Sequence, residues 1–162
     1  MGSNDVKVGI ADLNLVLDPG TIMTIGLGSC IGIALYDRML KVAGLSHIML
    51  PDSTQFKNAT NLMKFADSAI PILIDKMQKQ GCRKQNIVAK IAGGASMFNF
   101  SDKSIISDIG KRNSDAVRKT LKDIGIPIVA EDTGGNKGRT MILEAGTGKV
   151  TLKIVGKGTV EL

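Results

Sequence analysis

The chain is poor in the residues that support cross-linked, metal-bound or aromatic-rich folds. Its 162 residues include two cysteines, one histidine, one tyrosine and no tryptophan. Two cysteines are too few for a disulfide framework, and one histidine with two widely spaced cysteines does not make a zinc site. We therefore expect no metal and no cofactor, and a core filled mainly by Ile, Val, Leu and Met.

Long apolar runs and clustered basic residues are also missing. No run approaches the ~20 residues that a bilayer span needs, and the N-terminus lacks the pattern of a signal peptide. The formal net charge is +6, but no arginine cluster or aromatic ladder accompanies it, as nucleic-acid binding would require. We predict a cytoplasmic protein with no nucleic-acid partner and no membrane insertion. Its charge could favour an acidic partner surface, but lysines spread along the chain as solvated surface are the simpler interpretation.

Apolar periodicity predicts many strands and two main helices. Strands are expected at 6–10, 21–27, 31–36, 42–50, 87–92, 126–130, 141–143 and 150–155. Helical spacing spans 62–77, with Gly81 as a C-terminal cap, and 116–124, which ends at Gly125. Pro71 should kink the first helix or start a new segment. This order favours an α+β fold with layered sheets over a regular βαβ alternation.

Three glycine-rich segments fail or only weakly meet the known phosphate-binding patterns. The glycines at 26–28 follow a strand, but Ile31 stands where a dinucleotide fingerprint needs glycine, and another strand follows. The pair at 148–149 resembles the end of a P-loop, but Leu143 replaces its first glycine. Loop 133–139 could cradle an anion through its N–H groups, although a plain surface loop is the simpler interpretation.

Cys30 and His47 remain as candidates for nucleophilic catalysis. Cys30 follows Gly-Leu-Gly-Ser after a predicted strand, where glycines allow a sharp turn and close approach of a substrate. A hairpin would bring it beside His47, the only imidazole in the chain. A base of this kind takes the thiol proton and later returns it to a leaving amine. The backbone N–H groups of Cys30 and Ser29 could then face an oxyanion.

Two points stay open at this level. From composition alone, an inert core thiol and a structural histidine are the commoner interpretation. A third group should fix the tautomer of the imidazole, and sequence spacing does not choose among Thr24, Ser29, Ser46 and nearby acids.

Six segments, spread in order over nearly the whole chain, form a recognisable set. They are Thr24–Cys30 (TIGLGSC), Ala34–Asp37 (ALYD), Gly44–Pro51 (GLSHIMLP), Lys90–Met97 (KIAGGASM), Ile109–Asn113 (IGKRN), and Asp132–Gly135 with Gly138 and Arg139. Together they resemble the CheD family of chemoreceptor glutamine deamidases. The pairing of Gly-Ser-Cys with His-x-x-Leu-Pro is the most specific part of this resemblance.

The resemblance implies a single deamidase domain over 1–162, with layered mixed sheets flanked by helices, similar to deamidating bacterial toxins. It implies a triad of Cys30, His47 and Thr24 that converts receptor glutamines to glutamates, and it credits such proteins with hydrolysis of receptor glutamyl methyl esters. The implied partners are the cytoplasmic helices of chemoreceptors and the phosphatase CheC. An alternative is a regulatory module that docks to CheC and receptors, with catalysis secondary.

Overall fold

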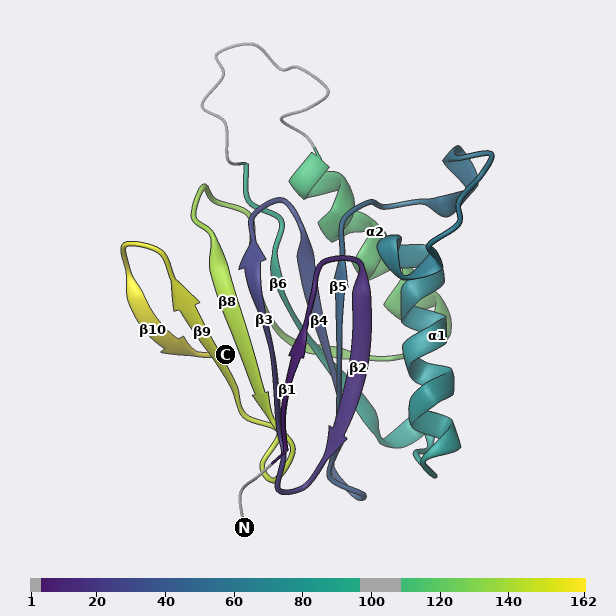
Figure 1. Cartoon of the computed structure of the whole chain (residues 1–162), viewed down its shortest axis with the longest axis vertical. Helices are drawn as coiled ribbons and strands as arrows, with labels where there is room; N and C mark the ends of the chain where they lie inside the picture. Colours follow the sequence, from purple (N-terminus) through teal and green to yellow (C-terminus); the bar gives the residue numbers. More distant parts are fainter. Residues whose placement is uncertain (1–3, 97–108) are drawn as a thin grey trace.

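The computed structural model describes residues 4–96 and 109–162 (Figure 1). The strands are β1 (Asp5–Val8), β2 (Asp12–Leu17), β3 (Thr21–Leu27), β4 (Ile31–Asp37), β5 (Val42–Ile48), β6 (Ile87–Gly93), β7 (Ile128–Thr133), β8 (Arg139–Glu144), β9 (Val150–Ile154) and β10 (Gly158–Glu161). The helices are α1 (Ala66–Lys79) and α2 (Ile109–Ile124), and short 3-10 turns lie at η1 (Ser53–Gln55), η2 (Leu62–Lys64) and η3 (Lys84–Asn86).

The strands form two mixed sheets. The first has the order β1-β3-β8-β9-β10 and the second the order β2-β5-β4-β6-β7. The pairs β1–β3 and β6–β7 are parallel, and the other pairs are antiparallel. Figure 1 shows α1 and α2 together on one side of the second sheet. The α+β class with layered sheets is therefore confirmed.

Two hydrophobic clusters hold these layers together. One lies between the two sheets and includes Ile22, Leu45 and Met141. The other lies between the second sheet and the helices and includes Ile33 and Leu73. Strands β4 and β5 contribute to both clusters and are buried along their whole length. Successive side chains alternate between the faces of a strand, so every second residue of β4 and β5 points toward the first sheet.

The helix ends follow the predicted glycine caps. At the end of α1, the N–H of Gly81 donates to the carbonyl of Gln78, and the N–H of Cys82 donates to that of Met77. This is a Schellman motif, with Gly81 in the left-handed region at φ 99°. Gly125 ends α2 in the same region, at φ 93°. Both predicted helix ends are confirmed.

Several predicted boundaries are wrong. Helix α1 runs unbroken through Pro71, because the completely buried Ile70 and Leu73 pack this part of it against the second sheet. Helix α2 begins at Ile109, earlier than the predicted 116. The predicted strand 6–10 ends at Val8, and β2 and β10 were not predicted. In residues 4–96 and 109–162, no helix has the length and apolar character needed to cross a bilayer.

Candidate active site

Thr24 and His47 meet between the two sheets. Thr24 lies on β3 of the first sheet and His47 on β5 of the second, and both are completely buried. The hydroxyl Oγ1 of Thr24 lies 2.6 Å from Nδ1 of His47 and 2.7 Å from the carbonyl oxygen of Val8. One side chain from each sheet thus contributes to a single hydrogen-bonded pair.

The bond to Val8 settles which ring nitrogen of His47 carries a proton. A carbonyl oxygen only accepts, so the single hydroxyl proton of Thr24 goes to Val8. The hydroxyl oxygen must then accept a proton from Nδ1 of His47. A neutral imidazole with hydrogen on Nδ1 has its lone pair on Nε2. This Nε2 atom is buried and has no hydrogen-bond partner among the described residues, so it is free to act as a base.

The pairing of β4 with β5 brings the turn that carries Cys30 to the end of the strand that carries His47. Gly32 is opposite His47 in this antiparallel pair, and Cys30 precedes Gly32 by two residues, just outside β4. The thiol makes no hydrogen bond to the ring, because Nε2 of His47 has no partner among the described residues. The thiol is free, half-buried, and packed against the inter-sheet cluster. Position 32 is tightly packed, because a Cβ atom there would lie 2.9 Å from the sulfur of Met141, whose side chain would have to shift.

Of the orienting groups that the sequence left open, Thr24 is the one that contacts the ring. Ser46 neighbours His47 on β5, so its side chain points to the opposite face of the sheet. Asp12 is opposite His47 on β2, but its carboxylate accepts the N–H of Leu13 at 2.8 Å. The structure therefore joins Thr24 to His47 between the two sheets, while Cys30 lies in the turn just before β4, the strand paired with that of His47.

Burial shifts the pKa values of both Cys30 and His47. It raises the pKa of the Cys30 thiol, and a hydrogen bond from the backbone of Cys30 opposes this with a smaller lowering effect. Burial also lowers the pKa of His47 to about 4. Both shifts favour the uncharged forms. At neutral pH the resting pair is therefore a thiol and a neutral imidazole, and not a thiolate–imidazolium ion pair.

The second cysteine is placed differently. Cys82 is buried beyond the end of α1, and burial, together with the charge and a hydrogen bond of Asp37, raises its pKa to about 12. A thiol in such surroundings is inert.

A glycine-rich segment supports the turn that carries Cys30. The N–H of Gly94 donates to the carbonyl of Cys30 at 2.9 Å, and the N–H of Ala95 donates to that of Gly28 at 2.8 Å. Gly93 has φ 120°, and a Cβ atom there would collide with the carbonyl oxygen of Cys30. Only glycine fits at this position.

Arg139 is a functional-site neighbour that reasoning from the residues did not single out. Its buried guanidinium donates to the carbonyls of Gly93 at 3.2 Å and Gly134 at 2.9 Å, and it pairs with Asp132 at 3.2 Å. The N–H of Gly134 donates in turn to the carbonyl of Gly93 at 2.9 Å. Loop 133–139 is thus tied to the segment behind Cys30. Its sequence signals were its place among glycines and its membership of a segment that carries the family resemblance.

Comparison with known proteins shows which family the chain belongs to. Residues 49–154 match the sequence model of the family described as CheD chemotactic sensory transduction. The chain belongs to the CheD family. Two relatives from Clostridium botulinum are each named "Probable chemoreceptor glutamine deamidase CheD". The protein from strain Alaska E43 is 74% identical over 162 residues, and that from strain Hall is 64% identical over 162 residues, with 100% of both chains covered in each case.

Among solved structures, similarity is slight. The Bacillus licheniformis hypothetical protein YfiH has a TM-score of 0.47 and 16% identity, and the match covers 75% of this chain and 50% of that chain. The family resemblance stated from the sequence is confirmed by the CheD relatives and not by this structure.

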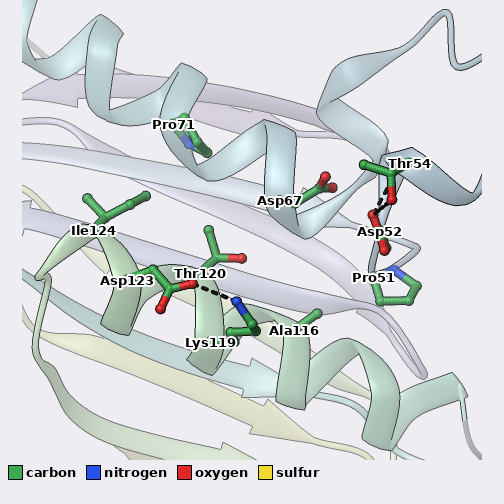
Figure 2. A pocket seen from close by; sticks show the side chains of 10 residues that line it. All are labelled: Pro51, Asp52, Thr54, Asp67, Pro71, Ala116, Lys119, Thr120, Asp123 and Ile124. Atoms are coloured by element: carbon green, nitrogen blue, oxygen red, sulfur yellow. Dashed lines mark hydrogen bonds and ion pairs between the residues drawn. The ribbon is translucent and has the colours of Figure 1, made fainter.

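This CheD chain also has a hollow of about 480 Å³ away from the three candidate residues (Figure 2). Figure 2 shows side chains of α1 and α2 facing each other across it, with Asp52 and Thr54 at one end. Its polar groups largely bind one another: Lys119 pairs with Asp123 at 2.7 Å, and Asp52 accepts the hydroxyl of Thr54 at 2.7 Å. Within the described residues, no group of three or more His, Cys, Asp or Glu side chains could hold a metal ion.

Proposed function

We propose that this protein hydrolyses the side-chain amide of selected chemoreceptor glutamines, giving glutamate and ammonia. The names of the two CheD relatives support the reaction and the substrate. The observation that carries the mechanism is the double role of the Thr24 hydroxyl, which donates to Val8 and accepts from Nδ1 of His47. It leaves Nε2 as a general base on the side of the ring where a nucleophile is needed.

The first half-reaction forms a thioester. Sγ of Cys30 attacks the carboxamide carbon while its proton passes to Nε2 of His47. Backbone N–H groups of Cys30 and Ser29 stabilise the oxyanion of the tetrahedral intermediate. The C–N bond then breaks, and the proton on Nε2 goes to the departing nitrogen, which leaves as ammonia. His47 ends this half-reaction neutral, as it began.

The second half-reaction releases glutamate. Water attacks the thioester carbon, and Nε2 of His47 takes a proton from it. The C–S bond breaks, and the proton returns to the sulfur of Cys30. Because the resting pair is uncharged, each attack requires proton transfer at that moment. The same steps would hydrolyse a glutamyl methyl ester, with methanol as the leaving group in place of ammonia.

The neutral hydroxyl of Thr24 stabilises imidazolium less than a carboxylate would. A modest catalyst of this kind suits an enzyme that edits a few sites on a receptor.

Recognition would come from a protein surface, namely the cytoplasmic helices of chemoreceptors, which are the substrate in this proposal. CheC would be a second partner. The alternative function is a regulatory module whose main work is docking to CheC and receptors. A Cys30→Ala protein that still produces every partner effect would favour that alternative.

The test is incubation with receptor cytoplasmic fragments followed by peptide mass measurement. Each converted glutamine gains ~1 Da, as amide becomes acid. Cys30→Ala should produce no gain, whereas Cys82→Ala, the matched change at the buried second thiol, should leave conversion intact. Conversion by Cys30→Ala at the wild-type rate would overturn the assignment of the nucleophile.

A further inference from the structure

Asn113, on α2, is completely buried and holds two carbonyl groups at the site. Its Nδ2 atom donates to the carbonyl oxygens of Ser29 and Met49, both at 2.9 Å. The two hydrogens of one amide nitrogen are thus both used. Two carbonyls need donors, so the side chain cannot be turned with its own oxygen toward them. Ser29 precedes the nucleophile, and Met49 lies two residues after His47.

These bonds begin where the β4–β5 ladder stops. The paired residues at that end are Ile31 and Ile48. Beyond them the two chains separate, and the N–H of Met49 bonds to the carbonyl of Lys64 at 2.9 Å. Cys30 and Met49 would be the next pair in register, but the ladder no longer joins them. Asn113 joins the two chains there, through the residue before Cys30 and the residue two after His47.

The bond to Ser29 also fixes a peptide plane. The carbonyl of Ser29 and the N–H of Cys30 belong to one trans peptide, so they point in opposite directions within one plane. With the oxygen held by α2, the N–H of Cys30 must point away from that helix. The carbonyl of Cys30, in the next peptide, is held by the N–H of Gly94 at 2.9 Å. Both peptide planes that flank the nucleophile are therefore held from outside its own turn.

We propose that Asn113 is a positioning residue for the nucleophile: it aims the N–H of Cys30 at the reaction centre and holds the Cys30 turn against the strand that carries His47. This inference rests on the proposed function, in which that N–H stabilises the oxyanion. A hydrogen bond from the backbone of Cys30 also lowers the pKa of its own thiol. The direction of the N–H therefore affects thiol reactivity even when no glutamine substrate is present.

The test measures the pH dependence of Cys30 alkylation by iodoacetamide, read by peptide mass. Asn113→Leu nearly keeps the volume and removes both donors, and Asn113→Gln keeps the donors but shifts them by one methylene. Val117→Ala is the matched control, because Val117 is buried on the same helix but lies in the core cluster. We expect Asn113→Leu to shift the alkylation profile to higher pH and to lower the rate near neutrality several-fold.

Asn113→Gln should recover part of the shift, and the Val117→Ala profile should match the wild type. Buried Cys82 serves as an internal control for folding, since its peptide is labelled only when the protein opens. If Asn113→Leu exposes Cys82, the alkylation profile of Asn113→Gln is compared with that of the wild type instead, and a smaller shift to higher pH is expected. A wild-type profile in a folded Asn113 variant would overturn the proposal.

Receptor deamidation by the same variants separates this inference from the proposed function. Asn113→Leu should lower kcat by about 10- to 100-fold with little change in KM, because a misaimed oxyanion donor affects the transition state. If the wild type does not deamidate receptors but the alkylation profile shifts, the function fails and the positioning role stands. If deamidation proceeds in the wild type and the profile does not shift, the positioning role fails alone.

Discussion

Thr24 accepts the Nδ1 proton of His47 across the boundary between two sheets, at an Oγ1–Nδ1 distance of 2.6 Å, while giving its own proton to Val8. In a Ser-His-Asp triad the orienting group is a charged carboxylate. Here a neutral hydroxyl fixes the tautomer, and a backbone carbonyl fixes the direction of that hydroxyl.

Removal of this hydroxyl should impair catalysis without unfolding the protein. Thr24→Val keeps the shape of the side chain and the strand preference, but Nδ1 loses its acceptor and the ring is free to take the wrong tautomer. We expect kcat for receptor deamidation to fall roughly 100-fold, and Thr24→Ser to retain a good part of the activity. Thr21→Val is a matched control, because Thr21 lies on the same strand and bonds to Asp5. Wild-type deamidation by a folded Thr24→Val protein would make Thr24 purely structural.

The activity should persist in acid further than an ordinary histidine allows. The proposed reaction needs neutral His47, and burial lowers the pKa of His47 to about 4. Activity should therefore change little between pH 7 and pH 5 and fall toward pH 4, whereas an unperturbed histidine, with a pKa of about 6.5, would already be mostly protonated at pH 5. Initial deamidation rates across this range give the measurement. An acid limb centred near pH 6.5 would contradict a buried base.

The same pKa predicts a loss of stability in acid. Above pH 6.5 His47 is neutral in both the folded and the unfolded protein, so it adds no pH dependence. Between pH 6.5 and about 4, His47 binds a proton in the unfolded chain but stays neutral in the folded protein. The free energy of unfolding should fall over that window by as much as about 3 kcal/mol.

Urea titrations at several pH values would measure this loss, with His47→Gln as the reference that lacks the titrating group. Both proteins will also lose stability as carboxylates protonate, so the difference between them isolates His47. Parallel curves for the two proteins would contradict the prediction.

Arg139 should stabilise the fold through the shape of its guanidinium group as well as through its charge. Arg139→Lys keeps the charge, but an ammonium group cannot reproduce the planar fork that reaches Gly93, Gly134 and Asp132. We expect a loss of about 2–3 kcal/mol in urea unfolding, because buried acceptors lose a charged donor.

Arg118→Lys is the matched change at the surface. Arg118 pairs with Glu131 at 2.7 Å, and both side chains are more than a third exposed. This variant should lose less than ~1 kcal/mol. Similar losses in the two variants would show that the arginine fork at position 139 has no special role.

The sequence allowed the β4–β5 hairpin to be predicted, and the structure confirms this hairpin. Both strands are strongly apolar and joined by a short turn, so the signal is local. The helix caps at Gly81 and Gly125 were equally local. Strand β10 could not be found in this way, because it is exposed along its length and pairs only with β9.

Contacts between layers could not be derived from strand patterns. The alternation along β3 shows that Thr24 can be buried, but not that it faces His47, since that depends on how two sheets stack. The family resemblance selected Thr24 among the open candidates, which spacing could not do. The bonds of Asn113 to Ser29 and Met49 join a helix to two chain segments far away in the sequence, and no periodicity encodes such a contact.

The two sheets also alternate along the chain, because β1 and β3 belong to one and β2, β4 and β5 to the other. The proposed base and its orienting hydroxyl come from opposite layers, so turnover by the proposed mechanism requires the layers to be docked as well as the strands to be formed. In a loosened, molten state, far-UV circular dichroism would still report strands, while near-UV signal and enzymatic activity would disappear together. Catalysis in this protein is thus a sensitive reporter of native tertiary packing.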